Sequence, residues 1–177
     1  LLRWISLARI VTTPFSQYTL LTGESTYRSA VDTVLDSAVN HLAIFDRDLA
    51  ALRLQEPQRL AKLVDFLRKQ SPEDRTKKLR IVIHQTHLLD SHMPRLMNLL
   101  TRYAHAVDVR QSPNNLRQLA DTHILADASH GVRRFHIDHA RCALIQADPA
   151  AIQPWQQRFE ELWSLSLPCL KLNTTGL

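Results

Sequence analysis

Polar and charged side chains follow three apolar segments of the chain, at the point where each segment ends. The apolar run 41–45 is followed by two carboxylates and an arginine, the run 79–83 by an imidazole and an amide, and the segment 107–110 ends on an arginine. Ligands of open α/β sheets bind beyond the carboxyl ends of the strands. We therefore expect a ligand pocket lined by Asp46, Arg47, Asp48, His84, Gln85 and Arg110. The alternative is that both aspartates are solvated loop charges and that Arg47 pairs with one of them.

The nine histidines of the chain raise the question of a metal site. The densest group is His136-Ile137-Asp138-His139, in which His136 and Asp138 share one face of a strand and His139 points to the other. A zinc site with three protein ligands would need a turn there and a distant ligand such as His123 or His130. Hydrogen-bonded or solvated histidines are the simpler interpretation, so we expect no metal and no cofactor.

Several enzyme motifs are absent from the sequence. The chain has three glycines and contains neither GxxxxGK[ST] nor GxGxxG, which argues against nucleotide folds built on those loops. No Gly-x-Ser-x-Gly sequence occurs. Cys142 and Cys169 show no metal-binding spacing and suit a reducing compartment. These absences remove the commonest hydrolase and nucleotide-binding classes.

The positive charge of the chain is spread along its length. There are 22 basic and 17 acidic residues, which give a net charge of +5 and an isoelectric point of about 9.6. The densest basic cluster is only Lys77-Lys78-Leu79-Arg80, whereas nucleic-acid binders gather their charge on one face. We therefore expect an anionic ligand rather than nucleic acid. No apolar run reaches the roughly 18–20 residues of a membrane span, so we expect a cytoplasmic protein that binds no membrane.

Strand and helix patterns alternate over the first two thirds of the chain. Short apolar runs predict strands at 18–21, 41–45, 79–83 and 107–110, and apolar residues three and four apart predict helices between them. Such alternation is typical of an α/β fold. We expect a mixed, mostly parallel β-sheet flanked by helices on both faces.

The pattern changes after residue 110. Segments 122–126 and 132–137 predict a hairpin, in which Gly131 supplies a positive φ, and 141–145 predicts a further strand. A last helix is expected to bury its apolar side chains on the sheet: Trp155, Phe159, Leu162 and Trp163. We assign 18–167 to one domain, 1–17 to an N-terminal extension or a remnant of upstream sequence, and 168–177 to a C-terminal tail.

This order of elements resembles one half of a phospholipase D-type domain. The segment His105-Ala106-Val107-Asp108-Val109-Arg110 is similar to the short strand that precedes the catalytic hairpin of that superfamily, and Phe159-Glu160-Glu161-Leu162-Trp163 resembles its closing helix. More narrowly, the chain looks like a bacterial family of uncharacterised proteins in which such a domain stands alone or follows an acetyltransferase domain. Single-half members of the superfamily pair to build a shared site, so the resemblance implies a homodimer.

The catalytic motif of that superfamily, His-x-Lys-x4-Asp, is degenerate here. If His123 is the nucleophile, Leu125 and His130 replace the lysine and the aspartate. If Asp127 is the aspartate, Ala120 and Thr122 replace the histidine and the lysine. No lysine lies between Lys78 and Lys171, so no local shift restores the pair.

Three functions follow as hypotheses. The first is a non-catalytic phospholipase D-like domain that serves as a binding, regulatory or assembly module. The second is a phosphodiesterase or nuclease in which His123 works with Arg133 or Arg134, because arginine also binds phosphate. The third is a nucleic-acid or anion binder that works by charge alone, which a steep dependence of affinity on salt would reveal.

Overall fold

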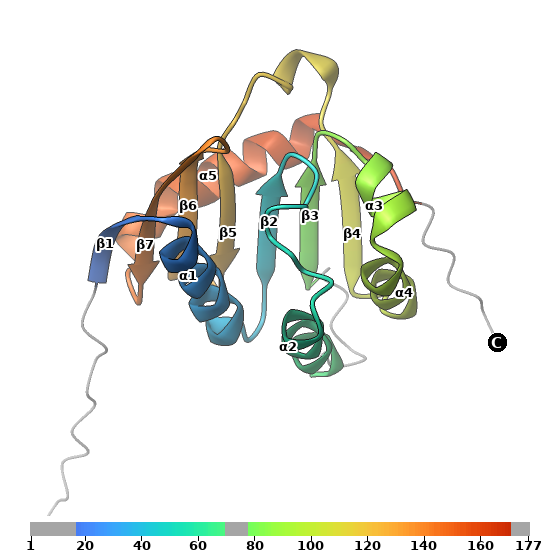
Figure 1. Ribbon diagram of the computed structural model, residues 1–177, viewed down its shortest axis with the longest axis horizontal. Helices are drawn as coiled ribbons and strands as arrows, with labels where there is room; N and C mark the ends of the chain where they lie inside the picture. Colours follow the sequence, from blue (N-terminus) through green and yellow to red (C-terminus); the bar gives the residue numbers. More distant parts are fainter. Residues whose placement is uncertain (1–16, 70–77, 171–177) are drawn as a thin grey trace, which may run out of the picture.

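Eight strands form one sheet in the part of the chain that the computed structural model describes, residues 17–69 and 78–170 (Figure 1). The strands are β1 (Gln17–Thr22), β2 (Leu42–Asp46), β3 (Leu79–Ile83), β4 (Val107–Gln111), β5 (Thr122–Ala126), β6 (His130–His136), β7 (His139–Gln146) and β8 (Leu167–Pro168). The helices are α1 (Glu24–Ser37), α2 (Pro57–Arg68), α3 (His87–His92), α4 (Pro94–Arg102) and α5 (Pro149–Leu165), with a 3₁₀ turn at Asn114–Leu116.

The strand order is β1-β7-β6-β5-β2-β3-β4-β8, and most neighbouring pairs are antiparallel. Only the pairs β2–β3 and β3–β4 are parallel. The predicted mostly parallel sheet is therefore wrong. The reason is that β1 pairs with β7 and not with β2, so that α1 crosses three strands before the chain enters β2. From β5 to β7 the chain returns by hairpins, which always pair strands antiparallel.

Helices cover both faces of the sheet, as predicted. Figure 1 shows α1, α2, α3 and α4 on the near face, whereas α5 crosses the far face diagonally. The core is accordingly in two parts. One lies between the sheet and the helices α1 to α4, and the other lies between the sheet and α5. The central strands β2 and β3 are nearly all apolar because both of their faces are covered.

The closing helix α5 packs its aromatic stripe on the sheet. Trp155, Phe159 and Leu162 are buried against side chains of β2, β3, β5 and β7, which confirms the predicted inward face. Trp163 is only partly buried, and the guanidinium group of Arg110 lies 4.1 Å from the centroid of its ring. Phe159 is 1% exposed, and its burial contributes on the order of 2–3 kcal/mol.

The turn between β5 and β6 obtains its positive φ angles from Asp127 (49°) and Ala128 (60°). This pair of angles is typical of the tight turns that match the twist of a hairpin. The Asp127 carboxylate accepts hydrogen bonds from three backbone N–H groups before β2: those of Val39 (2.5 Å), Asn40 (2.7 Å) and His41 (2.8 Å). The expectation that Gly131 supplies the positive φ is wrong.

Gly131 is required for space instead. It lies within β6 and is buried, and a Cβ atom at this position would lie 2.6 Å from Cδ1 of Ile152 and 2.9 Å from Cδ2 of Leu125. Both atoms belong to the core between the sheet and α5. The first turn of α5 thus lies directly on the bare backbone of β6, which sets the distance between this helix and the sheet.

We predict that Gly131→Ala lowers the free energy of unfolding by about 1–3 kcal/mol, because the added methyl group overfills this contact. Ile152→Val removes the atom nearest to the new Cβ and by itself costs about 0.5–1.5 kcal/mol. Urea denaturation of both single variants and the double variant checks the prediction. The double variant should lose less than the sum of the single losses, and strict additivity would contradict the proposed contact.

Candidate functional site

The carboxyl ends of β2, β3 and β4 meet at one edge of the sheet, where the predicted ligand residues lie. Asp46 ends β2 and is fully buried. Its carboxylate accepts hydrogen bonds from the backbone N–H groups of Asp48 (3.0 Å) and Leu49 (2.6 Å) and from the hydroxyl of Thr122 (2.6 Å). Burial raises the pKa of Asp46 in spite of these bonds. The Asp46 side chain thus shapes the loop after β2 and is not exposed to a ligand.

The loop after β2 is also attached to the end of β3. The carbonyl of Arg47 accepts hydrogen bonds from the backbone N–H groups of His84 (3.0 Å) and Gln85 (2.9 Å). Its side chain is half-exposed and donates to the buried carboxylate of Asp48 at 3.2 Å. Asp48 also accepts from the N–H of Ala50 at 3.0 Å. The structure therefore brings these predicted residues together, in a network of internal bonds.

His84 and Arg110 are held by separate contacts. The imidazole of His84 bonds to the hydroxyl of Ser112 and, at 3.0 Å, to the carbonyl of Leu119. A carbonyl only accepts, so Nε2 of His84 carries a proton, and burial lowers the pKa of the ring. Arg110 donates to the carbonyl of Trp163 at 3.2 Å and lies against that ring. Of the six predicted residues, Gln85 and Arg47 present the most accessible side chains.

His123 lies in the middle of the sheet under α5 and is fully buried. Its ring centroid is 5.2 Å from that of Phe45 and 6.0 Å from that of Phe159. Neither ring nitrogen has a hydrogen-bond partner in the described part of the chain. The nearest charge is the carboxylate of Asp121, whose Oδ2 lies 3.9 Å from Nδ1 of His123. Burial lowers the pKa of His123, although Asp121 opposes this shift.

Asp121 is a buried carboxylate held by two arginines from different elements. Arg158 of α5 donates two hydrogen bonds to it, at 2.6 and 3.2 Å, and Arg133 of β6 donates one at 3.2 Å. Burial alone would raise the pKa of Asp121, but His123 and the two guanidinium groups outweigh burial and hold it well below the usual range. Sequence patterns did not single out Asp121 or Arg158, because this ion cluster joins three separate segments.

Neither alignment of the degenerate motif yields a paired histidine and lysine. In the His123 alignment, Leu125 belongs to the core under α5. In the other alignment, Thr122 is hydrogen-bonded to Asp46, and Asp127 binds the three N–H groups before β2. The residues at the motif positions therefore fill the core or stabilise loops.

Arg134 connects the start of α1 to the turn between β6 and β7. Its guanidinium group makes a two-pronged ion pair with Glu24 at the start of α1, at 2.7 and 3.1 Å. It also donates to three carbonyls of the β6–β7 turn: those of His136 (3.2 Å), Ile137 (2.7 Å) and His139 (3.0 Å). Hydrogen bonding to Arg134 lowers the pKa of Glu24. The sequence offered one clue to this role, because Arg134 shares the inward face of β6 with Val132.

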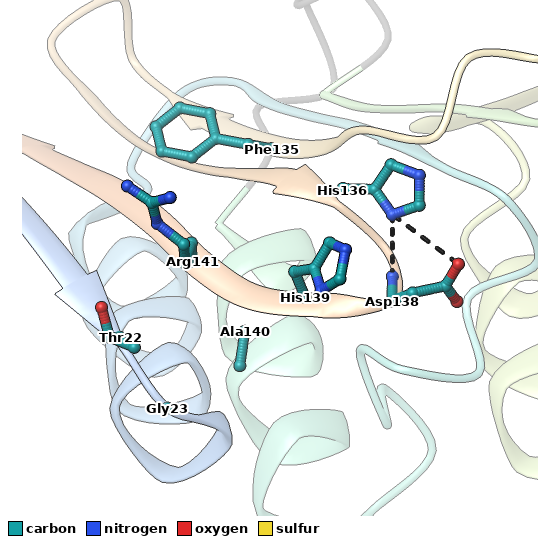
Figure 2. Close-up of a pocket in the computed structure, with 8 residues that line it drawn as sticks. All are labelled: Thr22, Gly23, Phe135, His136, Asp138, His139, Ala140 and Arg141. Carbon is teal, nitrogen blue, oxygen red and sulfur yellow. Dashed lines mark hydrogen bonds and ion pairs between the residues drawn. The ribbon is translucent and has the colours of Figure 1, made fainter.

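A pocket of about 670 Å³ opens beside this turn (Figure 2). It is lined by Thr22, Gly23, Phe135, His136, Asp138, His139, Ala140 and Arg141. The volume is in the range of small-molecule sites. Within residues 17–69 and 78–170, no three His, Cys, Asp or Glu side chains are grouped as a metal ion would require. The lining residues include two imidazoles, those of His136 and His139, and the guanidinium group of Arg141.

The chain has a phospholipase D-like α/β fold, as its similarity to solved structures shows. Nuc from Salmonella typhimurium, a phospholipase D family member, is similar at a TM-score of 0.63 and 14% identity, over 88% of this chain and 99% of Nuc. NucT from Helicobacter pylori is similar at a TM-score of 0.53 and 10% identity, over 88% of this chain and all of NucT (100%). The archaeal chromatin protein TrmBL2, whose structure shows a novel mode of DNA binding, is similar at a TM-score of 0.62 and 12% identity, over 93% of this chain and 57% of TrmBL2.

The chain belongs to the family described as Domain of unknown function (DUF7931), whose model matches residues 23–174. No curated protein matches the chain. Among the described helices, none combines the length and the apolar character needed to cross a membrane.

We predict that Asp121→Asn lowers the free energy of unfolding by about 2 kcal/mol at neutral pH, because two guanidinium groups lose a charged acceptor. The folded-state pKa of Asp121 lies below its unfolded value of about 3.9. Its contribution is therefore present above about pH 4 and is lost as the pH falls through the folded-state pKa. Unfolding measured from pH 3 to pH 7 should show the two proteins converging in acid.

The matched control is Asp65→Asn, which removes an exposed carboxylate on α2 and should change little at any pH. A difference between the parent and Asp121→Asn that stays constant from pH 7 to pH 3 would refute the role assigned to the Asp121 charge.

Proposed function

We propose that this chain is a non-catalytic phospholipase D-like domain that acts as a binding and assembly module. The observation that carries the proposal is the position of His123, buried between Phe45 and Phe159 beneath α5. Covalent catalysis by histidine requires a ring nitrogen that reaches the substrate. A substrate phosphate would reach His123 only after α5 had left the sheet.

The arginines next to His123 do not supply a substitute for the missing lysine. Arg133 lies opposite His123 in the β5–β6 register, but its guanidinium group is bonded to Asp121. Arg134 is buried and bonded to Glu24 and to the β6–β7 turn. An atypical histidine and arginine site, the alternative function, would require one of these ion pairs to break.

Assembly is supported by the position of β1 at one end of the strand order, where β7 is its only neighbour among the described strands. Tyr18 and Leu20 of this strand are 56% and 66% exposed. The sequence of β1, QYTLLT, contains no charge and no proline, which are the usual protections of an edge strand. We propose that two copies pair through β1, since one uncharged strand placed against its own copy is self-complementary.

Binding of nucleic acid by charge is the second candidate. It is favoured by the exposed Arg95 and Arg102 of α4, which make no ion pair within the described residues. TrmBL2, whose structure shows a novel mode of DNA binding, has a similar fold. Our proposal for this chain also includes a cytoplasmic location. It further includes an acetyltransferase domain as the upstream neighbour in some members of the family.

We predict that the purified chain does not hydrolyse bis(p-nitrophenyl) phosphate or single-stranded DNA, because no accessible nucleophile faces solvent at the motif positions. Release of p-nitrophenol, measured across a gel-filtration peak, checks this. Turnover that follows the protein peak and disappears in a folded His123→Asn variant would establish the enzyme instead.

We predict that the chain sediments as a dimer and that Leu20→Lys converts it to a monomer, because a charge on β1 opposes strand pairing. Leu167→Lys is the matched control, since Leu167 is 73% exposed on β8 at the other edge of the sheet. Sedimentation velocity of the three proteins decides the point. A monomeric parent, or a Leu20→Lys variant that remains dimeric, would contradict pairing through β1.

A further inference from the structure

The pocket beside the β6–β7 turn contains an arginine with no carboxylate partner. Arg141 is exposed and, in the part of the chain that the structure describes, makes no ion pair or hydrogen bond through its side chain. The neighbouring Arg134, in contrast, is neutralised by Glu24. A guanidinium group offers a planar fork of N–H donors that matches carboxylate and phosphate oxygens. Arg141 is therefore the group in this pocket that is free to bind an anion.

Two imidazoles add donors at the mouth of the same pocket. Nδ1 of His136 accepts a hydrogen bond from the backbone N–H of Asp138 at 3.2 Å, so the neutral ring carries its proton on Nε2. The ring of His139 lies 5.3 Å from that of His136 between centroids. Figure 2 shows both rings at the turn, with the Asp138 carboxylate on the far side of His136 from Arg141.

Phe135 gives the pocket an apolar wall. It is 42% exposed, which is unusual for a phenylalanine in the middle of a sheet. The β6–β7 ladder is irregular between Arg134 and His136, and such bulges turn side chains away from the regular alternation. An exposed aromatic ring in the same pocket as the unpaired Arg141 suits a ligand that carries both a planar ring and an anion.

The pocket is built on a rigid support. The guanidinium group of Arg134 binds the carbonyls of His136, Ile137 and His139, so the backbone that carries the two imidazoles is fixed from the inside of the sheet. The N–H of Gly23 donates to the carbonyl of Ala140 at 2.8 Å, which fixes the opposite wall. A preorganised site loses less conformational freedom when a ligand binds.

From these observations we propose that the β6–β7 pocket binds a small organic phosphate that carries a planar ring, of the mononucleotide type. The phosphate lies between Arg141 and the imidazoles of His136 and His139, and the ring lies on Phe135. Asp138 weakens the interaction because its carboxylate repels the phosphate. This inference rests on the proposed function in one respect, since it assigns a ligand to a binding module and involves no chemical step.

The test is isothermal titration calorimetry of the full chain with adenosine monophosphate, ribose 5-phosphate, adenosine and inorganic phosphate. We expect adenosine monophosphate to bind most tightly. Arg141→Gln should weaken it about tenfold or more, in line with the loss of a charged hydrogen bond. Phe135→Ala should weaken adenosine monophosphate but leave ribose 5-phosphate unchanged, and Asp138→Asn should strengthen both phosphates.

The control for charge is Arg102→Gln on α4, which removes another exposed guanidinium group, outside the pocket. A free nucleotide and the 5′ end of a nucleic acid both carry a phosphate next to a planar base. The affinity for a short oligonucleotide with a 5′-phosphate is therefore compared with the affinity for adenosine monophosphate. Binding that Arg141→Gln weakens and Arg102→Gln does not would support the site.

Equal losses in Arg141→Gln and Arg102→Gln, or no binding of adenosine monophosphate at millimolar concentration, would overturn the inference. The proposed lack of catalysis would survive such a result. Conversely, cleavage of the ligand during the titration would refute the proposed lack of catalysis but would leave the binding site in place.

Discussion

The buried guanidinium group of Arg134 is the interaction on which the structure around the β6–β7 turn depends. It binds Glu24 at the start of α1 and three carbonyls of the β6–β7 turn, and it lies 5.1 Å from the ring centroid of Tyr27. Desolvating a guanidinium group costs several kcal/mol unless nearly all its donors are used. Here its bonds join β6, β7 and α1, so this charge stabilises a turn that would otherwise be an isolated surface loop.

Two consecutive residues of β6 serve opposite faces of the sheet. Arg133 points toward α5 and binds Asp121, whereas Arg134 points toward α1 and binds Glu24. The strand pleat thereby separates two ion clusters by the thickness of the sheet. One cluster closes the core over His123, and the other supports the open pocket at the turn. The charged residues of both clusters stabilise the packing of the helices on the sheet.

The local elements could be predicted from the sequence, but their order in the sheet could not. The buried runs at β2 and β3, the β5–β6 hairpin and the inward face of α5 all follow from periodicity. Alternation of strands and helices looks the same whether β1 pairs with β2 or with β7. The residues around Gly131 favoured a turn at that position. Its contact with α5 could not be predicted, because Ile152 lies far from Gly131 in the sequence.

The candidate site was predicted only in part for a similar reason. Asp46 was placed correctly at the end of a strand, but its bond to Thr122 joins segments far apart in the chain. Asp121 and Arg158 likewise meet only through the packing of α5. Arg134 is the residue that closer attention to strand alternation would have found, since it lies two positions after a buried valine.

The pairing of β1 with β7 has a consequence for how the chain folds. Gln17 lies opposite Gln146, so this ladder joins the first described strand to the strand that precedes α5 and closes a long loop of the chain. Contacts of such long sequence separation form after local ones, because the entropy of loop closure must be met first. The β5–β6 and β6–β7 hairpins are local and provide the template on which β1 docks. By the same reasoning, β1 joins the sheet after these hairpins have formed, although it comes first in the chain.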